Sequence, residues 1–312
     1  MNMKNFSKLY SKNNIGLIPT YACNSSCDFC YAKNLKMKFP KEMSWKIFKK
    51  VIHRCQKEGK NEISFFGGEA TVWKYINEAV IYLKKRKIQV NFFTNGLIFP
   101  KNAPDCVLIN MHNVFDIKRR RLIGKSMGFY KENKTEIGIR YNVDCRSDKK
   151  NDKVFLKIIQ DWSDNIDYVS ISPAIPYPLS RILGNRIYNL THKIYRNGQK
   201  VRISRAIPIC LFNKKQFKFL REECFLHKKC FSVKNIVINP DGKTLYPCVS
   251  VFKEKNWEEE NLRDITKFYK RYFFDFGHIY GDKCQDCHYS KNYACQMGCL
   301  GTRQNKNQNC KC

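Results

Sequence analysis

Short apolar runs rich in β-branched and aromatic residues alternate with longer segments of helical periodicity over the first two-thirds of the chain. We expect strands at residues 15–20, 62–66, 88–94, 106–111, 136–143 and 168–172, and helices at 44–58, 73–85, 153–162 and 181–197. Ser44 is the expected N-cap of the first helix. Strand–helix alternation predicts a parallel sheet with right-handed crossovers. Six such units predict an α/β fold, a partial (β/α)6 TIM-like barrel.

The pattern changes after about residue 201. Residues 236–247 carry Asn239-Pro240-Asp241-Gly242 between two β-rich stretches, which predicts a β-hairpin. A charged helix is expected near 257–272, followed by a cysteine-rich end with too few apolar residues for an ordinary core. We therefore expect a barrel domain over 1–205 and a small cysteine-rich domain over 206–312, which metal sites hold together.

The strongly positive net charge has two explanations. The 312 residues carry a formal charge of +31, which favours acidic partners such as nucleic acid, an anionic cofactor or an acidic peptide. A general compositional bias explains the charge equally well, because lysine is spread throughout and no basic block is longer than the four residues 118–121. No apolar run approaches a membrane span and no signal peptide is visible, so we expect a cytoplasmic protein without a membrane partner.

The sixteen cysteines are the strongest chemical signal. A chain of this length without a secretory signal favours metal binding over a disulfide framework. Cys23, Cys27 and Cys30 lie within eight residues, directly after the first expected strand. Three thiolates on one loop suit a cubane iron–sulfur cluster with one iron left without a protein ligand. A zinc knuckle is the alternative, but it needs a fourth ligand; none is evident in the sequence, and His53 lies within an expected helix.

Three motifs in this region resemble those of the radical S-adenosylmethionine (SAM) enzymes. They are the cysteine spacing with an aromatic residue before the last cysteine, Gly67-Gly68-Glu69 after the second strand, and Thr94-Asn95-Gly96 after the third. The resemblance covers about residues 10 to 200. It implies that SAM chelates the open iron of a [4Fe–4S] cluster. An electron from the cluster then cleaves SAM to methionine and a 5′-deoxyadenosyl radical, which takes a hydrogen atom from the substrate.

The same resemblance implies a set of SAM-contacting residues. The peptide groups of Gly67 and Gly68, together with Glu69, would face the methionyl amino group. Phe29 and Tyr31 would flank the adenine, and Asn142 would reach the ribose. The third-strand motif would add Thr94 and Asn95 to the cofactor contacts.

The cysteine-rich tail resembles the SPASM extension that holds two auxiliary [4Fe–4S] clusters, for a total of three clusters per chain. By that resemblance the first auxiliary cluster is held by Cys224, Cys230, Cys248 and Cys299. The second is held by Cys284, Cys287, Cys295 and either Cys310 or Cys312. A pair of zinc sites is the alternative, because Cys284 and Cys287 have the spacing of a zinc ribbon.

These features favour a radical SAM/SPASM enzyme that modifies a peptide, most simply in ribosomal peptide (RiPP) maturation by crosslinking or epimerisation. A flavodoxin, ferredoxin or reductase would donate the electron, and an acidic leader would bind the barrel or arrive with a separate protein. The sulfatase-maturase branch is disfavoured because Val249 replaces the acidic residue that follows the Tyr-Pro-Cys segment. An RNA-modifying radical SAM enzyme is a further alternative, and a non-catalytic nucleic-acid-binding protein is the least favoured because no nucleic-acid motif is visible.

Cys210 is the candidate hydrogen donor if the reaction is an epimerisation. It ends the β-rich run 201–209, immediately before the SPASM-like cysteines begin. A thiol can return a hydrogen atom without being ionised. The alternative is a small buried hydrophobic residue, the usual environment of a single cysteine.

Overall fold

The computed structural model describes residues 13–27, 30–35, 37–143, 149–175, 180–226, 236–248, 251 and 253–277, with 287, 288, 295 and 299. The chain divides into two compact units. The first unit comprises residues 7–137 and 232–270, and the second comprises 1–6, 138–231 and 271–312. Each unit is described separately.

Parallel strands form the sheet of the first unit. They are β1 (Asn14–Leu17), β2 (Glu62–Phe65), β3 (Gln89–Thr94) and β4 (Cys106–Asn110), paired in that order. The predicted hairpin is present as β9 (Val237–Ile238) and β10 (Thr244–Tyr246), with β11 (Lys255–Asn256) beyond it. β9 pairs parallel to β1, so the hairpin extends the same sheet from its β1 side. The first strand of the barrel therefore has a neighbour on both sides.

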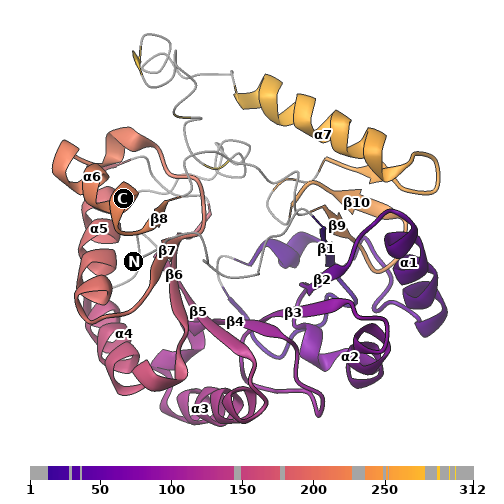
Figure 1. Cartoon of the computed structure of the whole chain (residues 1–312), viewed down its shortest axis with the longest axis horizontal. Coiled ribbons are helices and arrows are strands. Elements are labelled where there is room, and N and C mark those ends of the chain that lie inside the picture. The colour runs from indigo at the N-terminus through magenta and orange to yellow at the C-terminus, as the bar shows by residue number, and fades with distance from the viewer. Residues whose placement is uncertain are drawn as a thin grey trace. The chain divides into compact units, whose positions relative to one another are not determined.

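Helices follow the strands of the first unit, and Figure 1 shows α1 and α2 beside β1 to β3. Their bounds are α1 (Trp45–Lys57), α2 (Ile76–Lys84) and α3 (Ile117–Glu132), with short 3-10 helices η2 (Tyr31–Asn34), η3 (Ala70–Val72) and η4 (Met111–Phe115). Ser44 caps α1 as predicted, because its side chain accepts a hydrogen bond from the backbone N–H of Ile47. The buried face of α1 consists of Phe48, Val51, Ile52 and Cys55, at the spacing that an amphipathic helix requires.

The second unit continues the strand–helix alternation. Its parallel strands are β5 (Glu136–Val143), which begins two residues before the unit boundary, β6 (Tyr168–Pro173), β7 (Val201–Ile203) and β8 (Phe225–Leu226). Its other elements are α4 (Lys149–Asp161), η5 (Ser163–Asn165), α5 (Arg181–Arg196), η6 (Ile209–Leu211) and α6 (Lys214–Glu222). α7 (Leu262–Gly277) begins in the first unit and ends in the second. α5 packs against β6, β7 and η6.

All six predicted strands are present within three residues of their expected ends, but several other predictions differ from the structure. Residues 201–209 form a strand only over Val201–Ile203, and β8, α3 and α6 were not predicted. α2 begins at Ile76 rather than at Trp73, because η3 turns the chain and leaves Trp73 extended. α7 begins at Leu262, five residues later than expected.

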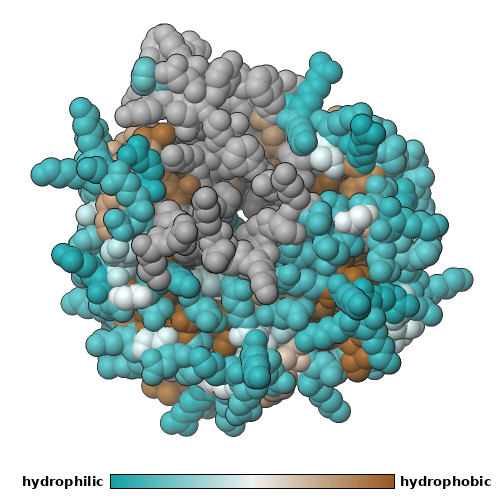
Figure 2. Space-filling view, viewed as in Figure 1, coloured by the Kyte–Doolittle hydropathy of each residue, from teal (hydrophilic) through white to brown (hydrophobic). Residues whose placement is uncertain are grey.

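None of the helices within the described ranges is long and apolar enough to cross a membrane. Figure 2 shows that hydrophilic residues cover most of the described surface on the face in view.

Gly184 allows α5 to pack closely on η6, and this contact gives a first prediction. A Cβ atom on Gly184 would lie 2.1 Å from the carbonyl oxygen of Leu211, which is backbone and cannot turn away. We expect Gly184→Ala to lower the free energy of unfolding by about 1–3 kcal/mol, the usual cost of overpacking. Chemical denaturation of both proteins measures the change.

Gly128 in α3 is the matched control, since a Cβ there meets no atom within 4 Å. Gly128→Ala should leave stability unchanged or raise it by up to about 1 kcal/mol, because alanine is the better helix former. Equal effects of the two substitutions would show that helix propensity, rather than the approach to Leu211, decides the result.

Candidate functional site

The three clustered cysteines lie on a loop that leaves the C-terminal end of β1. We call residues 20–30 the cysteine loop; Asp28 and Phe29, the latter an expected adenine contact, lie outside the described residues. Cys23, Cys27 and Cys30 are each partly exposed. The backbone N–H of Cys30 donates to the carbonyl of Cys27 at 3.2 Å, which closes a turn between the last two thiols. The loop therefore presents its sulfur atoms at the end of the sheet where barrel enzymes carry their sites.

The end of β2 pairs with the backbone of this loop. The N–H of Gly68 donates to the carbonyl of Thr20 at 3.1 Å, and the N–H of Glu69 donates to that of Ala22 at 2.8 Å. A Cβ on Gly68 would lie 2.2 Å from the carbonyl oxygen of Ala22, and Gly67 has a φ of +138°. Glycine is required at both positions, because a side chain would separate the two backbones or strain the turn.

Glu69 is buried and holds the ends of β2 and β3 together. Its Oε1 accepts from the N–H and hydroxyl of Thr71 and from the hydroxyl of Thr94, at 3.2, 2.8 and 2.9 Å. Its Oε2 accepts from the N–H of Asn95 at 2.7 Å. Burial raises the pKa of Glu69, and the hydrogen bonds from Asn95, Thr71 and Thr94 lower it in part. Both carboxylate oxygens thus bind donors of this chain, and the expected contact with a methionyl amino group stays a prediction.

The end of β3 contacts the cysteine loop through Asn95. The side-chain Nδ2 of Asn95 donates to Oδ1 of Asn24 at 2.7 Å and lies 4.0 Å from Sγ of Cys23. Its Oδ1 accepts from the N–H of Leu97, which fixes the side-chain orientation. Thr94 and Asn95, both expected from the sequence motif, therefore lie beside the loop.

The end of β4 contributes two contacts that the sequence analysis missed. Nε2 of His112 lies 2.8 Å from Sγ of Cys27, and the hydroxyl of Ser25 donates to Oδ1 of Asn113 at 3.2 Å. No fourth nitrogen or sulfur ligand is evident near the three cysteines in the sequence, but η4 brings His112 to the loop. The available signal was the polar pair His112-Asn113 directly after an expected strand.

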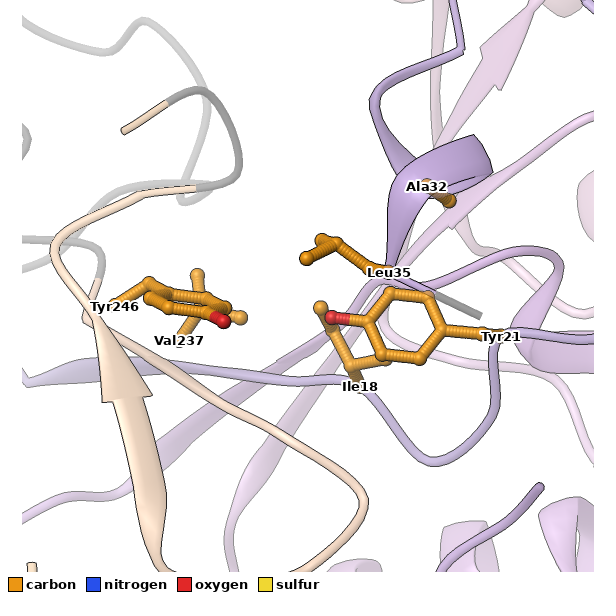
Figure 3. Packing of buried hydrophobic residues seen from close by; sticks show 6 residues of the cluster. All are labelled: Ile18, Tyr21, Ala32, Leu35, Val237 and Tyr246. Carbon is orange, nitrogen blue, oxygen red and sulfur yellow. The ribbon is translucent and has the colours of Figure 1, made fainter. Parts of the chain in front are cut away.

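A hydrophobic cluster fixes both ends of the loop to the hairpin (Figure 3). It consists of Ile18, Tyr21, Ala32, Leu35, Val237 and Tyr246. The hydroxyl of Tyr21 also donates to Oδ1 of Asn239 in the hairpin turn at 2.6 Å. Tyr31, an expected adenine contact, donates its hydroxyl to the carbonyl of Gly67 at 2.9 Å, and burial raises its pKa. The hairpin thus supports the first cysteine site as well as leading to Cys248.

The structure describes only some of the other predicted site residues. Cys224, Cys295 and Cys299 are buried, whereas Cys248 and Cys287 are partly exposed; Cys230, Cys284, Cys310 and Cys312 lie outside the described residues. Burial and the nearby Glu223 raise the pKa of the Cys224 thiol to about 12. Asn142 lies on β5, opposite Ser172 of β6.

Cys210 lies on η6 and is exposed, so it is not the buried hydrophobic residue that the alternative interpretation expected. Its role as a hydrogen donor stays a prediction.

Among the described residues, no three His, Cys, Asp or Glu side chains converge on a single-ion site. The donor set of the cysteine loop is nevertheless that of an iron–sulfur cluster, because it consists of thiols on one loop. Two of the three sulfurs also lie next to side-chain nitrogens, those of Asn95 and His112. Such nitrogens can donate hydrogen bonds to charged sulfur, so the residues present fit a cluster.

Glu69→Gln gives a second prediction. The substituted amide would place a donor against the N–H of Asn95 or against the three donors at Oε1, so at least one buried N–H or O–H would lose its acceptor. We expect the free energy of unfolding to fall by about 1–3 kcal/mol. Chemical denaturation measures the change.

Glu42→Gln is the control for this prediction. It removes an ion pair between the exposed Lys74 and the partly exposed Glu42, and should cost no more than about 1 kcal/mol. A loss at Glu69 no larger than that at Glu42 would contradict the structural role of the buried carboxylate.

Comparison with known proteins extends the resemblance seen in the sequence. The family model of the radical SAM superfamily matches residues 17–132. The sporulation killing factor maturation protein SkfB of Bacillus subtilis is 38% identical over 78 residues, which are 25% of this chain and 19% of SkfB. The chain thus matches only about a fifth of the length of this curated relative.

Two solved structures share the fold. SuiB of Streptococcus suis, bound to its precursor peptide SuiA, has a TM-score of 0.64 at 16% identity, covering 94% of this chain and 73% of SuiB. Native anSMEcpe with bound AdoMet has a TM-score of 0.66 at 16% identity, covering 95% and 91% of the two chains. These similarities support the predicted partial α/β barrel with an open, mainly parallel sheet. Residues 17–132, which include the cysteine loop, are therefore similar to the radical SAM superfamily.

Proposed function

We propose that this protein is an enzyme that binds SAM and a [4Fe–4S] cluster at the cysteine loop and modifies a peptide by radical chemistry. One observation carries the proposal: the ends of three successive parallel strands, β2, β3 and β4, all hold the loop that bears Cys23, Cys27 and Cys30. Asn24 is contacted from the end of β3, whereas Ser25 and Cys27 are both contacted from η4, after β4.

In this proposal the chain's own residues position the cluster. The three thiolates would hold the iron of the cluster, and the cluster would supply the electron for reductive cleavage of SAM. The backbone hydrogen bonds from Gly68 and Glu69 to the loop fix the position of Cys23 relative to the end of β2. Asn95 and His112 lie against two of the sulfurs and provide N–H groups there. Each interaction is made between residues of this chain, and such support from neighbouring residues is what a precise binding site requires.

SAM would bind beside the same strand ends. Glu69 is fixed in position by its four hydrogen bonds, so its carboxyl group is preorganised rather than mobile. Tyr31 is likewise fixed by its bond to Gly67, which holds the aromatic ring next to the glycine pair. These two residues, with Phe29, Thr94, Asn95 and Asn142, are the proposed SAM contacts.

A peptide substrate is the best supported class. SkfB, the relative with 38% identity over the matched stretch, is named for the maturation of the sporulation killing factor. SuiB, which shares the fold, has been solved with its precursor peptide SuiA. A net charge of +31 is complementary to an acidic peptide segment.

The tail would hold two auxiliary clusters in the arrangement expected from the sequence. Cys224, one of the proposed ligands, is buried. The buried Cys295 and Cys299 share this low exposure. The proposed ligands remain Cys224, Cys230, Cys248 and Cys299, and Cys284, Cys287, Cys295 with Cys310 or Cys312.

Iron content tests the cluster assignment. After anaerobic reconstitution we expect about twelve irons per chain, from three cubanes of about four irons each. Replacing Cys23, Cys27 and Cys30 together by alanine should remove about four irons and abolish formation of 5′-deoxyadenosine, with the tail clusters retained. Replacing the buried Cys55, which lies in α1, is the control and should leave about twelve irons. Full reconstitution with only about four irons, or zinc in the tail, would contradict the three-cluster assignment.

Salt dependence tests the acidic partner. The exposed cations of α3, among them Lys118, Arg121 and Lys125, attract an acidic peptide only while salt does not screen them. The screening length falls from about 10 Å at 0.1 M salt to about 3 Å at 1 M. We expect a fluorescent glutamate-rich peptide to bind several-fold more weakly at the higher salt, as measured by anisotropy.

A serine-rich peptide of equal length is the control and should show no such change. If the glutamate-rich peptide binds equally well at both salt concentrations, the charge is compositional and has no role in recognition.

A further inference from the structure

His112 contacts the sulfur of Cys27, and this contact bears on the redox properties of the proposed cluster. Its Nε2 lies 2.8 Å and its Nδ1 3.7 Å from Sγ of Cys27, so the ring directs its outer nitrogen at the sulfur. His112 comes from η4, at the end of β4, 85 residues away along the chain. The loop cannot form this contact by itself, because only the folded sheet brings η4 next to Cys27.

η4 is firmly fixed, so the position of the imidazole is set by the structure. Met111, Asn113 and Val114 on either side of His112 are buried. α3 secures the turn through two arginines: Arg119 donates to Oδ1 of Asn113 and Arg120 to the carbonyl of Val114, both at 2.8 Å. His112 lies between the buried Met111 and Asn113 and is partly exposed, and its side chain extends to the cysteine loop.

The same turn holds the loop at a second point. Ser25 donates to Oδ1 of Asn113 at 3.2 Å, two residues before Cys27. Asn113 is only 3% exposed, and its Nδ2 has no hydrogen-bond partner among the described residues. Two adjacent residues of η4 therefore contact the loop differently: Asn113 accepts from the hydroxyl of Ser25, and His112 reaches the sulfur of Cys27.

We propose that His112 is a positioning residue that donates its Nε2 hydrogen to the Cys27 sulfur and thereby raises the reduction potential of the cluster at the cysteine loop. This inference rests on the proposed function. Hydrogen bonds to cluster sulfurs stabilise the reduced, more negative state and are among the main factors that set the potential. The donor need only be the neutral ring with its hydrogen on Nε2, so no change of protonation is involved.

The test compares His112→Phe, which keeps an aromatic ring but has no N–H, with His112→Gln, which keeps an N–H donor. After anaerobic reconstitution, iron analysis checks that the cluster has formed. The midpoint potential is then measured by an EPR-monitored redox titration of the signal that changes when SAM is added. We expect a more negative potential in His112→Phe and a value close to wild type in His112→Gln.

Two further variants separate the hydrogen bond from general disturbance. His53→Phe makes the same substitution at an exposed position of α1 and should leave the potential unchanged. Ser25→Ala removes the other contact with η4 without touching a sulfur and should also leave it unchanged. If His112→Phe does not assemble the cluster, His112→Leu provides the same comparison with a smaller side chain.

Several results would overturn the inference. Equal potentials in wild type and in fully loaded His112→Phe would show that no bond to sulfur affects the cluster. An equal shift in Ser25→Ala would assign the effect to movement of the loop. Strong coupling of a ¹⁵N-labelled histidine to the cluster in pulsed EPR would make His112 an iron ligand instead of a donor. A wild-type protein without any SAM-responsive cluster would refute the proposed function itself, a result distinct from these three.

Discussion

The backbone pairing between the end of β2 and the cysteine loop is the contact on which the rest of the site depends. Gly68 and Glu69 donate to the carbonyls of Thr20 and Ala22, and the absence of a side chain at Gly68 is what lets the two segments meet. This pairing places Cys23 next to β3, where Asn95 reaches the loop, and Cys27 next to β4, where His112 reaches it. Glycines at this position therefore have a structural purpose that precedes any contact with a cofactor.

The site and the fold stabilise each other through the hairpin. β9 pairs with β1 and carries Val237 into the hydrophobic cluster behind the cysteine loop, while Tyr21 bonds to the hairpin turn at Asn239. Cys248 lies two positions beyond the end of β10. The hairpin therefore supports the first cysteine site and also connects directly to a proposed ligand of an auxiliary cluster. A disturbance of the hairpin should therefore affect both sites.

Much of this arrangement could be predicted from the sequence, because apolar periodicity and cysteine spacing are local signals. The strands, the Ser44 cap and the hairpin at Asn239-Pro240-Asp241-Gly242 follow from short patterns. α3 was missed because its buried face, with Ile123, Ser126, Met127 and Tyr130, includes a serine and its exposed face begins with a basic block. His112 was missed for a different reason: its partner Cys27 is 85 residues away, and no local pattern encodes a contact that only the sheet creates.

The central claim is that the cysteine loop holds a cluster with one iron open to SAM. Mössbauer spectroscopy of protein reconstituted with ⁵⁷Fe tests it most directly, because the spectrum distinguishes an iron with three sulfide ligands and a protein thiolate from one that binds another ligand. We predict that adding SAM changes the signal of a single iron site in wild-type protein and none in the variant lacking Cys23, Cys27 and Cys30. A wild-type spectrum that SAM leaves unchanged would contradict the account.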